Sequence, residues 1–235
     1  MSRTSMEILA DARSAAARHD DVTDTLAGLV DDCREVLSAG AVGLFVRPSA
    51  GRINLLSSSA HGSAVLELFR VQEVTGPCID AISADLAISV VGSEDVLNRW
   101  PAVGRAMIEC GYQRVHASPL HWRGKAVGAL DVLFVDLVPM ATEQTLLAQA
   151  FADVATLVVM QSAGCGDGEA GERIRSALGG RTIIEQATGV LAYQQTLDMP
   201  SAYDALVRTS RRNRTSLTVA AEGVVAGAMR RSRQV

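Results

Sequence analysis

The stretch from Arg181 to Gln195 reads RTIIEQATGVLAYQQ, and its pattern decides how the C-terminal part of the chain folds. Apolar residues recur in it at the spacing of one helical face: Ile183, Ile184, Ala187, Val190 and Leu191. Thr182 followed by Glu185 matches a capping box, which predicts that a helix begins there. The other side is too polar for a core helix and too weakly charged for a purely solvated one. We therefore expect partner helices on the apolar side and a binding surface on the polar side.

Two further helices are predicted after this stretch. Ser201 and Asp204, which follow Pro200, indicate the start of one. Thr215 or Ser216 indicates the start of the other. Their apolar faces are small: Ala202, Ala205, Leu206 and Thr209 in the first, and Leu217, Ala220, Ala221, Val224 and Ala228 in the second. Because short helices with such faces are not stable alone, we expect the three to share a modest core as an all-α three-helix module.

The net charge changes sign along the chain. Residues 1–165 contain 12 basic and 19 acidic residues, a net charge of −7, whereas residues 181–235 contain 8 basic and 4 acidic residues, a net charge of +4. Every basic residue of this C-terminal segment is arginine. The planar guanidinium group binds phosphate and stacks on bases. An acidic body with a basic, arginine-only tail therefore favours a nucleic-acid contact at the C-terminus.

Three of these arginines are expected to share one face of the second C-terminal helix. Arg208 and Arg211 are spaced i, i+3, and Arg208 and Arg212 are spaced i, i+4, so their side chains are neighbours on a helix. Arg214 extends the patch beyond the helix end. The alternative is an ordinary solvated face on which Asp204 pairs with Arg208.

The segment before residue 162 has a mixed pattern that predicts an α+β fold with an antiparallel sheet flanked by helices. Expected helices cover residues 22–37, 63–73, 77–82, 100–111 and 142–160, and expected strands cover residues 41–46, 52–59, 86–91, 114–122 and 125–134. The last two strands are joined at Arg123 and Gly124, as in a tight hairpin. The stretch SAGCGDGEAG at residues 162–171 is rich in Gly and Ser and is typical of a linker.

Composition excludes several classes of protein. The chain has 235 residues, 48% of them hydrophobic and 20% charged, which suits a medium domain plus a small one. No apolar run approaches the roughly 18 residues of a membrane span, and the N-terminus shows no signal peptide, so we expect a cytoplasmic protein. The four cysteines are scattered without a C-x-x-C pair: Cys33, Cys78, Cys110 and Cys165. Free thiols are therefore expected, and no metal site or cofactor is predicted.

Motifs in the N-terminal part resemble those of a GAF domain of the actinobacterial type. The likeness covers residues 18–162 and rests on GPCIDAI, on RWP at 99–101, on CGYQRVHASPL and on GKAVGALDVLF. It implies a sensor domain with a small-molecule pocket, often dimeric through its terminal helices. Five residues are candidates for the pocket lining: Cys78, Trp100, Arg105, His116 and Ser118. Core packing is an equally open role for Trp100.

The segments R-x-x-I-E-Q-A-x-G-V-L-A, S-A-Y-D-A-L-V-R and L-x-x-x-A resemble the ANTAR domain, a three-helix RNA-binding module of bacterial antiterminators. The module is expected at residues 172–235, after a linker at residues 163–171. Arg181, Glu185, Gln186, Ala187, Gly189, Ala205, Arg208 and Ala220 match its pattern, whereas Thr188 stands where a lysine is frequent. The predicted RNA-binding residues are Arg181, Glu185, Gln186, Ala187, Gly189, Arg208, Arg211 and Arg212.

Gly189 and Gln186 each leave two roles open. A glycine in mid-helix costs about 1 kcal/mol relative to alanine, so it indicates a close approach, either by RNA or by a neighbouring helix. Gln186 offers both a donor and an acceptor to an exposed base edge, as recognition of single-stranded loops requires. Its alternative role is that of a solvent-facing side chain.

Together these features predict a sensor-regulated antiterminator that binds paired hairpin loops in nascent mRNA, as a homodimer, with a possible small-molecule ligand in the sensor domain. No catalytic residue is predicted. One alternative is a DNA-binding regulator that uses the last two helices as a helix-turn-helix, although the second of these lacks base-reading polar residues. Another is a thiol-dependent reductase built on Cys78 and Cys110, which would need a lowered thiol pKa.

Overall fold

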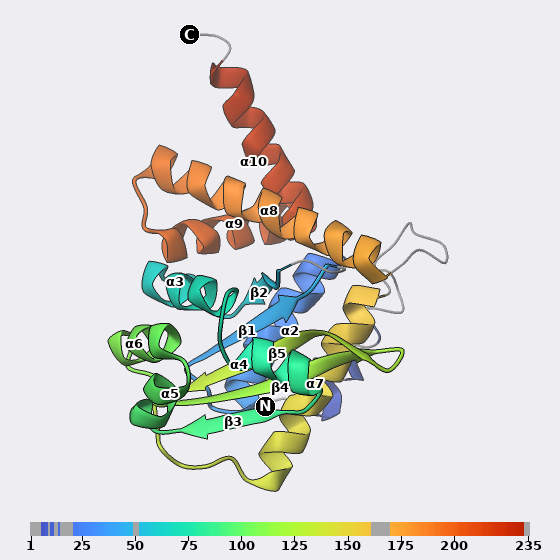
Figure 1. Ribbon diagram of the computed structural model, residues 1–235. Coiled ribbons are helices and arrows are strands. Elements are labelled where there is room, and N and C mark those ends of the chain that lie inside the picture. Colours follow the sequence, from blue (N-terminus) through green and yellow to red (C-terminus); the bar gives the residue numbers. More distant parts are fainter. Residues whose placement is uncertain are drawn as a thin grey trace.

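The computed structural model describes residues 6–8, 10–11, 14, 21–48, 52–160 and 170–232. Within these, an α+β body carries three helices at one end, formed by the last part of the chain (Figure 1). Most of the expected linker and Cys165 lie outside the described residues. None of the described helices combines the length and the apolar content that crossing a membrane requires.

The body is built around a five-stranded sheet in the order β2-β1-β5-β4-β3, in which every pair of neighbours is antiparallel. The strands are β1 (Ala41–Val46), β2 (Asn54–Ser58), β3 (Ile88–Val91), β4 (Arg114–Trp122) and β5 (Lys125–Phe134). Between β4 and β5, Arg123 and Gly124 have φ of 52° and 74°. Two successive positive φ values define the tight hairpin turn that the sequence predicts. The predicted α+β class is confirmed.

Helices cover both faces of this sheet. On one face lie α2 (Val22–Val36) and α7 (Thr142–Met160); on the other lie α3 (Ser63–Gln72), α4 (Pro77–Ala84), α5 (Ser93–Arg99) and α6 (Pro101–Glu109). The sequence did not predict α5, a single short helix that ends one residue before Trp100. Each face has its own apolar core, because successive strand residues point to opposite sides of a sheet.

The C-terminal module consists of α8 (Ala170–Gln195), α9 (Met199–Asn213) and α10 (Leu217–Ser232). Their common core is small, as expected: Ile184, Ala187, Leu191, Ala202, Leu206, Leu217, Ala220 and Ala221. Asp198 caps α9 by accepting a hydrogen bond from the Ser201 backbone N–H at 2.8 Å, so this helix begins slightly before the predicted position. Ser216 accepts from the Val219 N–H at 3.2 Å and marks the start of α10, as predicted.

The capping box predicted at Thr182 is wrong, because α8 begins at Ala170 and runs for 26 residues. The Thr182 hydroxyl donates to the carbonyl of Leu178 one turn earlier, and Glu185 forms an ion pair with Arg181. The glycine pair before this point looks like a helix break in sequence. A Cβ on Gly180 would lie 2.4 Å from the Thr23 Oγ1 atom. The glycine therefore allows α8 to approach α2 closely.

The C-terminal module rests against the body through polar contacts as well as through this close approach. The carboxylate of Asp24, on α2, accepts hydrogen bonds from the Leu217 backbone N–H at 2.9 and 3.0 Å. It therefore caps α10, a helix 193 residues further along the chain. Next to it, the rings of His61 and Tyr203 stack with centroids 3.6 Å apart. We call this boundary between the body and α8–α10 the junction.

Candidate nucleic-acid interface

Helix α9 presents its arginines to solvent. Ala202, Leu206 and Ser210 are its buried residues, so Arg208, Arg211 and Arg212 lie on the opposite side of the helix, and all three are exposed. None of the three forms an ion pair with any residue that the structure describes. The alternative from the sequence, an ion pair between Asp204 and Arg208, is therefore not formed among the described residues. Three guanidinium groups on one turn and a half of helix are free to bind phosphate.

An open cavity of about 350 Å³, with a mixed polar and apolar lining, lies where α8, α9 and α10 meet. Its hydrogen-bonding groups come from all three helices and from the connection between the last two: Gln194, Thr209, Asn213, Thr215 and Arg231. The Arg231 Nη2 atom donates to the Gln194 Oε1 atom at 2.9 Å, which links α8 to α10. Thr209 and Asn213, spaced i, i+4, line the cavity from a different side of α9 than the one that carries the arginines. Amide and hydroxyl groups of this kind can recognise the edge of an unpaired base.

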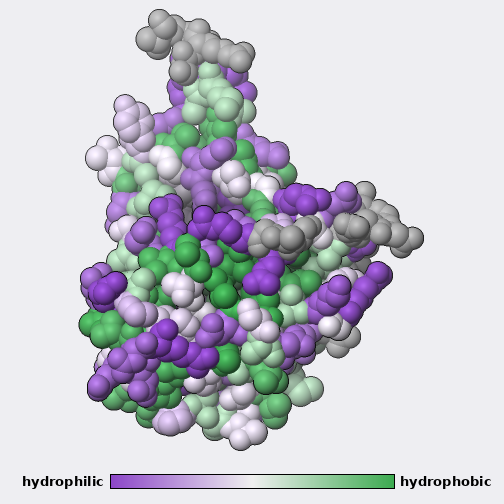
Figure 2. All heavy atoms as spheres, in the orientation of Figure 1, coloured by the Kyte–Doolittle hydropathy of each residue, from purple (hydrophilic) through white to green (hydrophobic). Residues whose placement is uncertain are grey.

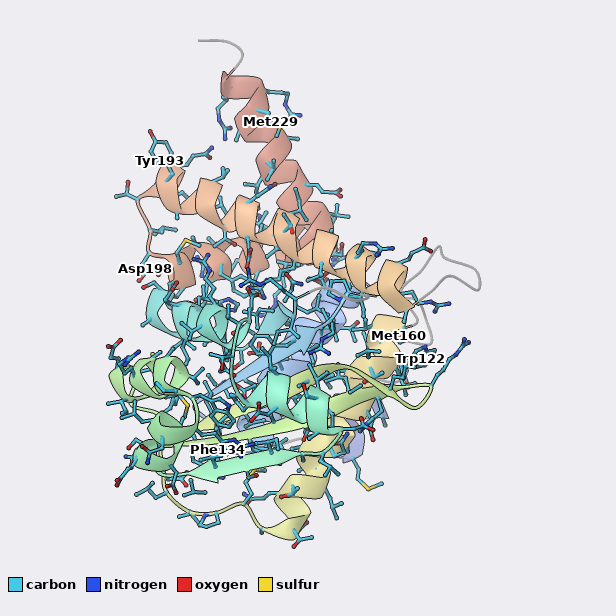
Figure 3. The ribbon with its side chains drawn as sticks, in the orientation of Figure 1. Trp122, Phe134, Met160, Tyr193, Asp198 and Met229 are labelled. Carbon is cyan, nitrogen blue, oxygen red and sulfur yellow. The ribbon has the colours of Figure 1, made fainter. Side chains whose placement is uncertain are left out.

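A shallow apolar groove continues from this cavity between α8 and α10. Gln186, Gly189, Tyr193 and Gln194 border it on α8, and Met229 borders it on α10. The Tyr193 side chain is 89% exposed and that of Met229 is 61% exposed, and both residues lie on the outer part of the module (Figure 3). Bases of single-stranded RNA stack on exposed aromatic rings of this kind.

Gly189 is not a packing glycine. A Cβ built on it would have no atom within 4 Å, so neither neighbouring helix requires its small size. Of its two possible roles, close packing against a neighbouring helix is therefore excluded, and close approach by RNA remains. Gln186 is exposed and borders the same groove.

Ala187, Arg181 and Glu185 are placed differently from what the sequence suggested. Ala187 has no exposed surface and packs in the core of the module, so its small size serves helix packing and a direct RNA contact by it is not possible in this arrangement. Arg181 and Glu185 form an ion pair at the junction, where the Arg181 side chain is only 17% exposed. Thr188 is also buried, and its hydroxyl donates to the Ile184 carbonyl at 2.8 Å.

The five residues predicted to line a pocket in the body do not come together. Cys78 and Trp100 pack in the core on the α3–α6 face of the sheet, together with Ala117 of β4. His116 and Ser118 flank Ala117 on the same strand and therefore point to the opposite face. Arg105 is exposed on α6. This prediction is wrong because it ignored the alternation of side chains along β4.

Buried polar side chains of the body form hydrogen bonds on both faces of the sheet, although the Nε and Nη1 atoms of Arg114 and the Oδ1 atom of Asp131 are buried without a hydrogen-bond partner. The His116 ring lies between two serine hydroxyls. Its Nδ1 atom is 2.6 Å from the Ser89 Oγ atom, and its Nε2 atom is 3.0 Å from the Ser118 Oγ atom. Burial lowers the pKa of His116 to about 4, so this ring is neutral. On the other face, Gln72 donates to the Asp131 carboxyl at 2.7 Å. Burial raises the pKa of Asp131 to about 7.

The thiols are not set up for catalysis. Cys78 is fully buried, and burial raises its pKa well above the ordinary value, with the carboxyl of Asp131 acting in the same direction. Burial also raises the pKa of Cys110. A nucleophilic cysteine needs the opposite shift. The arrangement of these residues therefore speaks against the thiol-dependent alternative.

Comparison with known proteins identifies both parts of the chain. Residues 172–225 match the family model of the ANTAR domain. The body is similar to the phycocyanobilin-bound GAF domain from a cyanobacterial phytochrome, with 10% sequence identity and a TM-score of 0.53 over 69% of this chain and 97% of that chain. It is also similar to the GAF domain from an Acinetobacter phosphoenolpyruvate-protein phosphotransferase, with 10% identity and a TM-score of 0.50 over 72% of this chain and 100% of that chain. No curated protein matches the chain.

The chain therefore has two parts, a body with a GAF-like fold and C-terminal helices that match the ANTAR domain. The five-stranded antiparallel sheet with its flanking helices is the GAF-like part, and α8–α10 coincide with the ANTAR region. The chain thus combines a GAF-like domain with an ANTAR domain. The ANTAR match covers most of α8–α10, and the likeness to GAF domains at 10% identity shows the fold of the body.

Proposed function

We propose that the protein binds hairpin loops in nascent mRNA through α8–α10 and thereby prevents formation of an overlapping terminator. One observation carries the proposal most: the helices that match ANTAR present three exposed guanidiniums on α9 without ion-pair partners among the described residues, and amide and hydroxyl groups in the cavity where α8–α10 meet. The guanidiniums bind the loop phosphates, and the cavity and the apolar groove accept unpaired bases. We also propose that the GAF-like domain is of the actinobacterial type and spans residues 18–162, that the ANTAR domain spans residues 172–235, and that the protein is cytoplasmic.

Tyr193 is added here to the predicted RNA-binding residues, and Ala187 is removed from them. Stacking of one base on an exposed aromatic ring contributes about 1–3 kcal/mol. Gln186 and Gly189 border the same groove, so a base that stacks on Tyr193 passes over the open space beside the glycine. Arg181 contacts RNA only if the junction opens, because its side chain is 17% exposed there, whereas the Glu185 side chain is 57% exposed and accessible without opening.

Pairing of two hairpins is proposed to involve a homodimer. One three-helix module offers a single arginine face, so two copies hold two loops. Linking two binding sites in one assembly raises the effective concentration for the second loop without any new contact. Dimerisation and loop binding are therefore expected to reinforce each other.

Binding to a leader RNA that contains two hairpins tests the proposal. Replacement of Arg208 and Arg211 by alanine is expected to weaken binding by at least tenfold, because two charge-assisted contacts are lost. Arg105→Ala and Arg123→Ala, two exposed body residues, form the matched control pair and are expected to leave affinity unchanged. Unchanged affinity in the α9 double variant would count against the proposed surface.

Duplex DNA is the competitor that separates RNA binding from DNA binding. In a helix-turn-helix, the N-terminal residues of the second helix read the bases. Here the first turn of α10 is held against α2 by Asp24, which would place a carboxylate next to the DNA. We therefore expect hairpin RNA to compete at far lower concentration than duplex DNA.

A further inference from the structure

The junction contains a recess that neither domain forms alone. Body residues contribute Leu56, Ser57 and His61, and the C-terminal helices contribute Ile184, Thr188 and Tyr203. Its volume is about 70 Å³, and its lining is mainly apolar. A space of this size admits the apolar end of a small molecule, whereas the rest of such a molecule has to extend outward.

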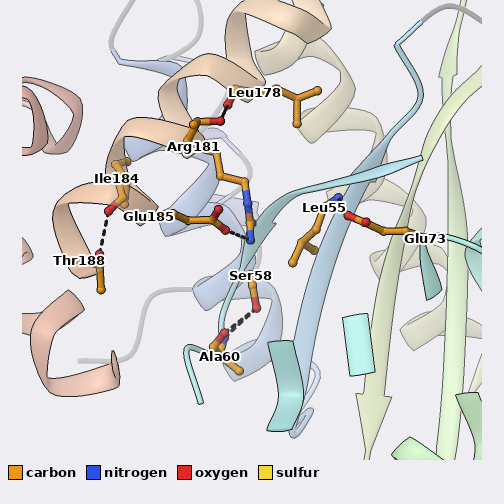
Figure 4. Close-up of polar contacts among 10 residues, drawn as sticks. Leu55, Ser58, Ala60, Glu73, Leu178, Arg181, Ile184, Glu185 and Thr188 are labelled. Carbon is orange, nitrogen blue, oxygen red and sulfur yellow. Dashed lines mark hydrogen bonds and ion pairs between the residues drawn. The ribbon is translucent and has the colours of Figure 1, made fainter. Parts of the chain in front are cut away.

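A wider groove of about 450 Å³ lies beside this recess, between β2 and α3 on one side and α8 on the other. Leu66, Arg181 and Glu185 border both spaces, so the two are continuous. Figure 4 shows the Arg181 side chain extending from α8 toward β2, with Glu185 beside it. In Figure 2, hydrophilic residues form a band across this face of the molecule at the level of α3 and α8.

The charges of the groove favour an anion. Arg52, Arg70 and Arg181 bring three guanidiniums to it from three different elements. Of the two carboxylates, Glu185 pairs with Arg181, and the Glu73 Oε1 atom accepts a hydrogen bond from the Leu55 N–H at 2.9 Å. Arg70 has a loose, exposed contact with Glu67 at 3.6 Å.

Arg52 is exposed and has no ion-pair partner among the residues that the structure describes. An incoming carboxylate or phosphate would meet this free guanidinium first. It could then replace Glu185 as the partner of Arg181 at the border of the recess.

The recess differs from the groove because, apart from Arg181 and Glu185 at its border, its polar side chains are uncharged. Burial lowers the pKa of His61 to about 4, with the nearby Arg181 guanidinium acting in the same direction. Burial raises the pKa of Tyr203 to about 12. At neutral pH both rings are therefore neutral and stacked, and they offer an apolar surface with hydrogen-bonding edges.

We propose that the junction is a binding site for a small organic anion, with its apolar end in the recess and its carboxylate or phosphate group among Arg52, Arg70 and Arg181. Such a ligand contacts the GAF-like body and the ANTAR helices together. It therefore changes the free energy of their docking by its difference in affinity for the docked and undocked states. This assigns signal detection to the space between the domains and does not depend on whether the protein binds RNA.

Isothermal titration calorimetry on the full chain tests the site with benzoate and phenyl phosphate as probes. Both are expected to bind once per chain, and the tighter of the two shows whether the groove prefers a carboxylate or a phosphate. Inorganic phosphate and benzyl alcohol, which each carry one half of the proposed ligand, are expected to bind at least tenfold more weakly. Failure of both aromatic anions to bind would overturn the proposal.

Two variants locate the binding. Arg52→Gln removes an exposed, unpaired guanidinium and is expected to weaken binding about tenfold. Leu66→Trp fills the place where recess and groove meet and is expected to abolish binding, with an unchanged circular dichroism spectrum and melting curve as the check on folding. Arg105→Gln, on the far helix α6, is the matched control and is expected to bind as the wild type does. Wild-type affinity in both junction variants, or a loss confined to Arg105→Gln, would refute the assignment.

Discussion

Acidification is expected to loosen the docking of α8–α10 on the body, because His61 must be neutral in the docked state. The ring stacks on Tyr203 at 3.6 Å between centroids and with an angle of 21° between the planes. Burial lowers its pKa to about 4, the Arg181 guanidinium adds to this shift, and Asp204 opposes it. When the junction opens, the ring returns to water and to an ordinary pKa of about 6.5.

The sign and size of the effect follow from these two pKa values. Because the docked state lowers the pKa of this basic group, its contribution to the free energy of docking is fully present above pH 6.5 and is lost as the pH falls toward 4. At pH 5, the loss amounts to about 2 kcal/mol, or roughly a thirtyfold increase in the open population. Asp24 has the opposite effect on the pH dependence of docking. Burial raises its pKa, so protonation of its carboxyl at low pH favours the docked state.

Hydrogen exchange of the Leu217 amide measures the opening directly, since this N–H donates to the Asp24 carboxylate in the docked state. After correction for intrinsic rates, the protection of this amide is expected to fall about thirtyfold more in the wild type than in His61→Phe between pH 8 and pH 5. His61→Phe keeps an aromatic ring for stacking but cannot titrate, and it leaves Asp24 unchanged. Equal losses of protection in the two proteins would refute the reasoning.

Two further predictions concern the body and the helix contact. Asp131→Asn is expected to change the free energy of unfolding more favourably at pH 8 than at pH 5, with a difference of about 2–3 kcal/mol between the two pH values. The reason is that burial raises the pKa of this carboxyl to about 7, so its ionised form destabilises the fold at pH 8. Urea unfolding at both pH values measures the difference. Gly180→Val is expected to weaken the docking of α8 on the body, because the new Cβ would lie 2.4 Å from the Thr23 Oγ1 atom. Gly179 has open space around it, so Gly179→Ala is expected to stabilise α8 by up to about 1 kcal/mol. Exchange rates in α8 distinguish the two variants, and equal rates would contradict the close approach.

Local patterns in the sequence predicted most of the fold. The alternation in β4 and β5 and the Arg123-Gly124 turn define a hairpin without outside information. The apolar stripe of α8 and the arginine spacing of α9 likewise depend only on helical periodicity. Both are as predicted except for Val190, which borders the groove and not the core. In these segments local preference and tertiary packing favour the same structure.

The remaining features depend on contacts between distant residues, which periodicity cannot reveal. The start of α8 was misplaced because Thr182 and Glu185 match a capping box, although both side chains make their contacts inside a helix that begins at Ala170. Ala187 was assigned to the RNA surface, yet it lies on the side that packs against α9 and α10. Tyr193 was missed because nothing in its sequence pattern marks it as exposed. Only the fold shows that it is 89% exposed.

The salt dependence of RNA affinity tests the central claim most directly, since that claim is that the free guanidiniums of α9 bind RNA phosphates. Affinity for a two-hairpin leader RNA is measured from low to high salt for the wild type and for the triple variant Arg208→Gln, Arg211→Gln, Arg212→Gln. If each arginine neutralises one phosphate, the log–log slope becomes shallower by about 2 in the variant. A slope that equals that of the wild type would contradict the account.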